Sequence, residues 1–363
     1  MEIQSNNFCI ILAGGRGKRL WPSSRMERPK QFVDFFGTGR TQLQSTYDRM
    51  AAFIPKENIY VCTCENFTAL THEQLPDLPK ENILEEPVNR NTAPSVAWAG
   101  LRIHRRSDEA RIIVVPSDQF IVGDDSFSDC VQRGLDFVAQ NDMILTMGVK
   151  PTRPEPGYGY IQMGEPTATA GIFKVQSFTE KPERDFARIF MESDEFLWNT
   201  GMFLANIRYL QQFFKQTLTD IPHRLDPLND EMSPSEELAY VMTHYPAYPN
   251  LSMDKVTLEM SDNAYVMRCN FGWADLGTWH SIYEFMQRQE GDNVTIDSEV
   301  VLENCRDNIV KLPKGHVGVI NGLEGYIVAE QGDVLLICPK SDSSALIRKY
   351  VNEVGIRYGE EFI

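Results

Sequence analysis

The residue types that most clearly suggest chemistry lie in a glycine-rich segment, which reads LAGGRGKRLWPSSRMERPK over residues 12–30. Glycines that follow an apolar strand let backbone N–H groups approach a phosphate and form a concavity that binds anions. Arg19 and Lys30 add fixed positive charge, which suits a triphosphate whose leaving group is strongly negative. The candidate nucleotide contacts in this loop are Leu12, Ala13, Gly14, Gly15 and Gly17.

Two familiar phosphate-binding motifs do not fit this loop. A dinucleotide fingerprint needs a third glycine where this chain has Leu20, and a Walker A loop needs Ser or Thr where it has Arg19. Residues 16–30 hold six basic side chains and one acidic side chain, although the net charge of the 363-residue chain is −16. Such a segment indicates either a small anionic ligand or a solvated basic loop, and charge alone does not decide. The overall acidity argues against a nucleic-acid-binding protein.

Two aspartates are candidates for holding a divalent cation. Asp118 follows the apolar run 112–115 and Pro116, and open α/β sheets bind ligands beyond the carboxyl ends of their strands. Mg²⁺ prefers hard oxygen ligands and keeps several waters, so a carboxylate there could hold a phosphate-bound ion. From the residues alone, a helix cap or a turn is the better reading of Asp118. Asp275 could in turn cap a helix that begins near Thr278.

The elements that must position these residues alternate between strand and helix. Apolar runs predict buried strands at residues 8–12, 59–62, 112–115 and 143–149. Helical patterns fall between these runs, and Asn91 and Thr92 are candidate caps for one of the helices. The alternation predicts a Rossmann-like, doubly wound α/β fold.

After residue 150 the regular alternation of strands and helices is no longer apparent in the sequence. Residues 157–163 and 172–179 predict strands, 186–192 and 272–288 predict helices, and the proline-rich stretch 222–249 predicts loops around one helix. Short strands follow at 300–302, 317–320, 326–328 and 334–337, and a closing helix at 341–354. We therefore expect a catalytic domain at residues 1–290 and a small β-rich, β-helix-like domain at 291–363.

Other signals in the sequence are weak. Seven scattered cysteines without a C-x-x-C pair, and six histidines without metal-ligand spacing, predict neither a disulfide framework nor a zinc site. The apolar run 8–13 is too short for a signal peptide or a membrane span. The expected compartment is the cytoplasm, with no membrane partner.

Taken together, the motifs resemble the sugar-1-phosphate nucleotidylyltransferases, in particular the bacterial, monofunctional guanylyl branch that uses mannose 1-phosphate. The resemblance covers essentially the whole chain. Beside the glycine-rich loop it rests on EPVNRNTAP at 86–94, PSD at 116–118, PTRPEPGYGY at 151–160, FTEKP at 178–182, WNTGMF at 198–203 and WADLG at 273–277.

This resemblance implies a reaction and a set of catalytic residues. GMP would pass from GTP to α-D-mannose 1-phosphate, which gives GDP-mannose and diphosphate. Arg19 and Lys30 would neutralise the departing diphosphate, while Asp118 and Asp275 would ligate the Mg²⁺ cofactor. The fold would be the mixed-sheet type of nucleotide-diphospho-sugar transferases, and the enzyme a homodimer. One departure is Gln119, where many relatives have His.

The resemblance also implies residues for the two substrates. For the nucleotide these are Glu86, Asn91, Thr92, Pro116 and Asp118, and for the sugar phosphate Gly159, Glu180, Lys181, Asn199 and Asp254. A carboxylate is a natural partner for the N–H donors on guanine. Without the resemblance, an ordinary loop and capped helix would explain residues 85–92, and Glu180 with Lys181 would be an exposed ion pair of little energetic value.

Three alternatives remain at the level of sequence. A relative specific for another nucleotide or sugar, such as a glucose-1-phosphate thymidylyl- or uridylyltransferase, is disfavoured by residues 86–94. A non-catalytic regulatory subunit that binds nucleotide sugars should have lost phosphate or metal ligands, and this chain retains all four of Arg19, Lys30, Asp118 and Asp275. The length predicts an enzyme without a fused isomerase domain.

Overall fold

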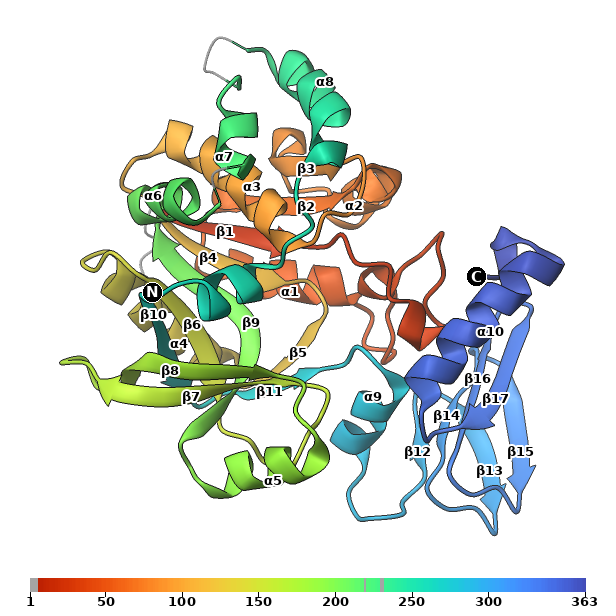
Figure 1. The fold of residues 1–363 in the computed structure, drawn as a ribbon. Helices are drawn as coiled ribbons and strands as arrows, with labels where there is room; N and C mark the ends of the chain where they lie inside the picture. The colour runs from red at the N-terminus through yellow and green to blue at the C-terminus, as the bar shows by residue number, and fades with distance from the viewer. Residues whose placement is uncertain (1–5, 219, 229–231) are drawn as a thin grey trace. The chain divides into compact units, whose positions relative to one another are not determined.

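The computed structural model describes residues 6–218, 220–228 and 232–363. A nine-stranded mixed sheet is its largest element (Figure 1), with the strand order β3-β2-β1-β4-β9-β6-β10-β8-β7. The strands are β1 Asn7–Leu12, β2 Ile59–Cys64, β3 Ile83–Glu86, β4 Arg111–Pro116, β6 Ile144–Val149, β7 Gly159–Pro166, β8 Ile172–Glu180, β9 Phe196–Asn206 and β10 Ala264–Cys269. Parallel pairing of β3, β2, β1 and β4, followed by antiparallel pairing of β4 with β9, confirms the predicted mixed α/β sheet.

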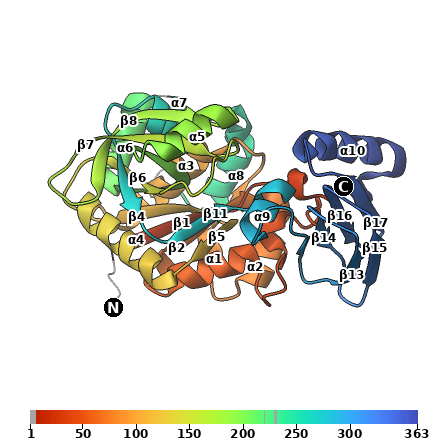
Figure 2. The same ribbon diagram turned by 90° about the horizontal axis from the view of Figure 1, so that it is seen from below.

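The four strands predicted from apolar runs all form, because their side chains are buried on both faces of the sheet. Helices cover both faces, with α3 and α6 on one side and α4 on the other (Figures 1 and 2). The helices are α1 Gln42–Ala51, α2 Thr68–Gln74, α3 Thr92–Arg106, α4 Asp124–Val138, α5 Arg184–Glu192, α6 Ile207–Thr217, α7 Asp220–Leu225, α8 Pro234–His244, α9 Trp279–Met286 and α10 Ser343–Tyr358.

The predicted strand-rich C-terminal part is also present. The short strands are β12 Val294–Thr295, β13 Glu299–Glu303, β14 Ile309–Lys311, β15 Val317–Asn321, β16 Tyr326–Gln331 and β17 Val334–Pro339. β12, β14 and β16 pair in parallel at successive turns of the chain, and so do β13 and β15. This coiling resembles a fragment of a β-helix, and α10 follows it as the sequence predicts.

Two local predictions were wrong. The stretch 222–249 contains most of α7 and all of α8, not one helix; residues 229–231 of that stretch lie outside the described residues. Residues 272–275, at the start of the stretch 272–288 that was expected to be helical, form the short strand β11 (Gly272–Asp275); the helix itself begins at Trp279, next to Thr278, as expected. The sequence of residues 272–275, an aromatic residue among small ones, is compatible with a strand as well as with a helix, so the pattern did not distinguish the two.

The backbone contacts divide the chain into two compact units. The first comprises residues up to Gly14, residues 47–117 and residues 121–273; the second comprises residues 15–46, 118–120 and 274–363. The first unit has its main core between α3, α6 and the sheet, around Trp98 and Phe214. The second has a core of Leu20, Trp21, Trp279, Ile347 and Val351. The division into domains at residue 290 stays a prediction.

Among the residues that the structure describes, no helix combines the length and the apolar composition needed to cross a bilayer.

Candidate active site

The glycine-rich loop begins where β1 ends. The backbone N–H of Ala13 donates to the carbonyl of Cys62 at 2.8 Å, which continues the ladder between β1 and β2 by one residue. Beyond it, Gly17 has a φ of 59°, in the left-handed region that favours glycine. A Cβ at Gly17 would lie 2.6 Å from Ser24 Oγ and 2.8 Å from Lys30 Cγ. The loop can therefore pass close to Lys30 only if position 17 is glycine.

Four predicted side chains, far apart in sequence, lie close together in the second unit. Lys30 Nζ lies 2.5 Å from Asp118 Oδ2. A Cβ at Gly277 would lie 3.0 Å from Asp275 Oδ1, 3.1 Å from Arg19 Nη2 and 3.4 Å from Lys30 Nζ. The fold thus places Arg19, Lys30 and Asp275 around one glycine, and Asp118 joins this group through its ion pair with Lys30.

The electrostatics of this cluster keep the lysine charged. Burial of Lys30 favours its neutral amine, but the negative charges of Asp118 and Asp275 and the hydrogen bond to Asp118 outweigh burial and raise its pKa. Only 7% of the Lys30 surface is exposed, so its ammonium interacts with its neighbours through little intervening water.

Neither aspartate caps a helix. Asp118 lies in the turn between β4 and β5 (Gln119–Val122). Asp275 is the last residue of β11, and the cap of α9 is Thr278, whose hydroxyl accepts a hydrogen bond from the N–H of Ser281 at 3.0 Å. The capping alternative for both aspartates is therefore wrong, although a turn remains a structural reading of Asp118.

The donor set suits a magnesium ion that is bound mainly by its substrate. Within the described ranges no three side chains of His, Cys, Asp or Glu gather as a metal site. The two carboxylates provide hard oxygen atoms, and Mg²⁺ in nucleotide sites commonly takes one or two carboxylates together with phosphate oxygens and water. Asp118 and Asp275 therefore fit such an ion better than a metal held entirely by protein.

A second group of predicted residues lies at the end of β3, in the first unit. Glu86 is the last residue of β3 and is 2% exposed. A Cβ at Gly14 would lie 3.4 Å from Glu86 Oε2. Because glycine has no Cβ, the backbone of the loop faces the carboxyl group directly. Burial raises the pKa of Glu86 from 4.5 to about 7, against the opposing effect of hydrogen bonds from Ser95 and Tyr245. Its Oε1 accepts no hydrogen bond from the described residues, so it can accept one from a ligand.

The neighbouring Asn91 and Thr92 have structural roles. Asn91 is the N-cap of α3, as predicted, and its Oδ1 accepts a hydrogen bond from the N–H of Thr92 at 3.1 Å. The hydroxyl oxygen of Thr92 accepts one from the N–H of Met253 at 2.7 Å. These bonds hold the start of the helix, and contact of either residue with a nucleotide stays a prediction.

The residues predicted to bind the sugar phosphate also lie together in the first unit. Gly159 on β7 pairs with Glu180 on β8, and a Cβ at Gly159 would lie 2.9 Å from Glu180 Oε2. Lys181 has a φ of 48° and forms an ion pair with the adjacent Glu180. Both side chains are about half exposed, with values of 56% and 48%, and can therefore reach a ligand.

Asn199 and Asp254 form a hydrogen-bonded pair in the same region. Asn199 Nδ2 donates to Asp254 Oδ1 at 2.7 Å, and Asn199 Oδ1 accepts from the N–H of Gly201 at 3.0 Å. Burial raises the pKa of Asp254, opposed by the bond from Asn199, and the charges of Glu180 and Lys181 act on it as well. Asn199 and Asp254 are therefore in direct contact, and Glu180 and Lys181 lie close enough for their charges to act on Asp254.

Several partners of these residues could not be predicted from the sequence. The hydroxyl groups of Ser95 and Tyr245 lie 3.4 Å apart beside Glu86 and favour its ionised form, and Tyr245 is fully buried although it lies 159 positions further along the chain. Thr146 donates to Asn199 Oδ1 at 3.4 Å and to the carbonyl of Met202 at 3.1 Å. No local pattern marks these hydroxyls, because each works through contacts that form only when distant elements pack.

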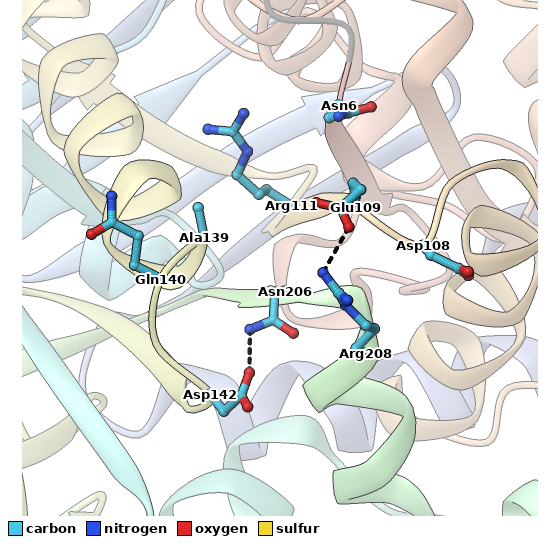
Figure 3. A pocket seen from close by; sticks show the side chains of 9 residues that line it. All are labelled: Asn6, Asp108, Glu109, Arg111, Ala139, Gln140, Asp142, Asn206 and Arg208. Carbon is cyan, nitrogen blue, oxygen red and sulfur yellow. Dashed lines mark hydrogen bonds and ion pairs between the residues drawn. The ribbon is translucent and has the colours of Figure 1, made fainter.

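A large cavity of about 480 Å³ contains none of the predicted residues (Figure 3). It lies where β4 begins at Arg111 and β9 ends at Asn206. This is the opposite end of β4 from Pro116, which was predicted to contact the nucleotide. Its charged side chains are paired within the protein, for example Arg208 with Glu109 at 2.8 Å. The cavity volume and the predicted residues therefore point to different ends of the sheet.

Comparisons with known proteins show the family of the chain. A family model described as "Nucleotidyl transferase" matches residues 8–291. Mannose-1-phosphate guanylyltransferases of Salmonella muenchen and Escherichia coli (strain K12) are 32% and 33% identical to the chain, over 94% and 97% of its length. The matches span 72% and 74% of those proteins.

Solved structures show the same fold. A crystal structure from Thermus thermophilus, described as a mannose-1-phosphate geranyltransferase, has a TM-score of 0.83 at 27% identity and covers 96% of this chain and 99% of that one. A mannose-6-phosphate isomerase structure from Helicobacter pylori has a TM-score of 0.57 at 21% identity over 74% of this chain and 99% of that one. At that identity the second likeness concerns the fold alone.

Proposed function

The chain belongs to the nucleotidyl transferase family, among its mannose-1-phosphate guanylyltransferases, and we propose how its own residues perform that reaction. It is an enzyme that transfers GMP from GTP to mannose 1-phosphate. A phosphate oxygen of the sugar phosphate attacks the α-phosphorus of GTP, and the bond from that phosphorus to the diphosphate breaks. The attacking phosphate is already ionised at neutral pH, so the step needs no general base.

The cluster of Arg19, Lys30, Asp118 and Asp275 is the observation that carries this proposal. Arg19 and Lys30 neutralise the charge that develops on the diphosphate as it leaves, and the raised pKa of Lys30 keeps its ammonium charged for this purpose. Asp118 and Asp275 would hold Mg²⁺, which when bound offsets phosphate charge and orients the phosphates. Positioning and electrostatics therefore provide most of the rate enhancement.

The remaining residues select the substrates. The backbone of Gly14, Gly15 and Gly17 contacts the triphosphate, and ionised Glu86 accepts hydrogen bonds from the N1–H and N2–H groups of guanine. Glu180 and the pair of Asn199 with Asp254 bind mannose hydroxyl groups, and Lys181 binds the sugar phosphate. Leu12, Ala13, Asn91, Thr92, Pro116 and Gly159 complete the proposed contacts.

The experiment that tests this function measures diphosphate release with four nucleoside triphosphates and several hexose 1-phosphates. We expect the highest kcat/KM for GTP with mannose 1-phosphate, and its loss when EDTA removes divalent cations. Lys30→Ala, purified in parallel, controls for contaminating enzymes. A higher kcat/KM for another pair would establish a different specificity, and no turnover with any pair would favour a regulatory subunit.

We also propose a cytoplasmic homodimer. Val301 on β13 and Val317 and Val319 on β15 are 58%, 64% and 77% exposed on paired strands, an apolar surface that a second copy would cover. Light scattering at micromolar concentration should give twice the monomer mass, and Val319→Lys should lower it. A monomer of the unaltered protein would refute the dimer.

A further inference from the structure

The last residues of the sequence bind the segment that joins Arg19 to Lys30. The indole Nε1 of Trp21 donates to the carbonyl of Phe362 at 2.8 Å, and the backbone N–H of Met26 donates to the carbonyl of Ile363 at 2.8 Å. Residues 360–363 are called the C-terminal strap below. These two bonds connect positions more than 330 residues apart in the chain, and both lie within the second unit.

Arg25 adds two more bonds to the same segment. Its Nη1 donates to the carbonyl of Glu361 in the strap at 3.3 Å, and its Nη2 donates to the carbonyl of Gln331 at the end of β16. A guanidinium group can bridge two carbonyl oxygens in a fixed geometry, whereas an ammonium group is a point donor. Arg25 therefore joins the segment both to the strap and to the β-rich part of the second unit.

The strap is itself anchored on α10. A Cβ at Gly355 would lie 2.9 Å from Ile363 Cδ1, so the last side chain packs against the helix where it has no side chain. α10 in turn packs against the short 3₁₀ helix η1 (Lys18–Leu20), which carries Arg19. Ile347 and Val351 of α10 share a core with Leu20. Helix α10 therefore holds the start of the segment at Leu20, and the strap holds it at Trp21 and Met26.

These contacts leave the segment little freedom. Trp21 is 4% exposed, and its own carbonyl accepts a hydrogen bond from Trp279 Nε1 at 3.1 Å. The buried indole N–H of Trp21 would lose its acceptor without the strap, and an unsatisfied buried donor is costly. Removal of the strap would therefore let the segment between Arg19 and Lys30 leave its position.

We infer that the C-terminal strap, acting through Trp21 and Arg25, positions Arg19 and Lys30 for the departing diphosphate. This inference rests on the roles proposed above for those two cations. A displacement of about 1 Å can reduce a rate about 100-fold, although the residues that cause it never contact the substrate. Trp21, Arg25 and the strap are accordingly positioning residues.

The test compares four variants in both directions of the reaction: deletion of residues 360–363, Trp21→Phe, Arg25→Ala and Arg25→Lys. We expect the deletion to lower kcat about 10- to 100-fold and to raise the KM for diphosphate in the reverse reaction, with the KM for GDP-mannose unchanged. Trp21→Phe should show a smaller change of the same kind. Arg25→Lys should be as impaired as Arg25→Ala, because the lysine cannot bridge two carbonyls.

Two controls make the outcome decisive. Arg357→Ala removes an exposed ion pair of α10 with Glu353 and should leave all constants unchanged. Global damage would lower the active fraction, and so kcat, without changing the KM for diphosphate; that result, or a deletion variant with normal constants, would overturn the inference. Arg19→Ala and Lys30→Ala separate the two proposals, since normal turnover in both would refute the catalytic roles proposed for these cations, whatever the deletion variant does.

Discussion

The ammonium group of Lys30 lies 2.5 Å from a carboxylate oxygen of Asp118, although 88 positions separate the two residues in the chain. Exposed fractions of 8% and 24% leave this pair only partly accessible to water. In the proposed reaction Lys30 binds the leaving diphosphate and Asp118 binds a cation. The ion pair between them must therefore weaken when the substrate and the cation bind. The ion pair with Asp118 thus keeps Lys30 protonated before GTP binds.

Substitution of either cation should affect turnover far more than binding of the product. We expect Lys30→Ala and Arg19→Ala each to lower kcat about 100- to 1000-fold, roughly 3 kcal/mol of transition-state stabilisation. GDP-mannose lacks the diphosphate leaving group, so its Kd, measured by calorimetry, should change little. Arg28→Ala is a matched control, because Arg28 is an exposed cation of the same basic segment. Equal losses in all three variants would mean that general positive charge, not position, matters.

The pKa of Glu86 makes stability and substrate binding depend on pH in opposite directions. Burial raises this pKa from 4.5 to about 7, so between these values the folded protein holds a proton that the unfolded chain has lost. Stability should therefore fall as pH rises from about 4.5 to 7, by up to about 3 kcal/mol. The KM for GTP should fall over the upper part of this range, because the ionised carboxylate is the form that accepts hydrogen bonds from guanine.

Glu86→Gln separates these two effects. The variant should lose this part of the pH dependence of its melting temperature, and at pH 8 it should be relatively more stable than the unaltered protein. Its KM for GTP should be high and nearly independent of pH. Calorimetric melting curves and initial rates from pH 5 to 8 provide both measurements. A KM for GTP that matches the unaltered enzyme at pH 8 would remove Glu86 from guanine recognition.

Loss of Asn199 should alter how Asp254 titrates. The hydrogen bond from Asn199 favours the ionised form of Asp254, against the burial that raises its pKa. Asn199→Ala should raise that pKa further, so the acid limb of kcat/KM for mannose 1-phosphate should move to higher pH. Asp254→Asn should abolish that limb. An unshifted limb in Asn199→Ala would show that the pair does not act on the sugar phosphate.

The sequence was most informative where one local property decides the structure. β1, β2, β4 and β6 were predictable because strands buried on both faces must be apolar throughout. The longest strand, β9, carries Asn199 and Thr200 in its middle and has Gly201 at a φ of 69°, so its pattern resembles a loop. Its place in the sheet depends on pairing with β4, β6 and β7, which no window of sequence contains.

The same limit applies to the site. The family motifs predicted a set of site residues, and the structure brings four of them, Arg19, Lys30, Asp118 and Asp275, close together. The sequence could not predict the Lys30–Asp118 ion pair or the strap that binds Trp21, because both depend on how distant segments pack. The cap near Asp275 could be located only approximately, since helix ends are set by local geometry within a few residues.

The final prediction concerns the two aspartates as a unit. If Asp118 and Asp275 hold one Mg²⁺, loss of either should remove the same function, and Asp118→Asn/Asp275→Asn should be little slower than either single variant. Helix capping no longer competes as an explanation, because Thr278 caps α9. Thr278→Ala is therefore the matched control: it should cost about 1 kcal/mol of stability while retaining the Mg²⁺ dependence of turnover. Titration of Mg²⁺ against kcat, with melting curves for all four variants, provides the measurement. If the two single variants retained near-normal turnover, and their losses of stability simply added, both aspartates would be structural and the cation would bind elsewhere.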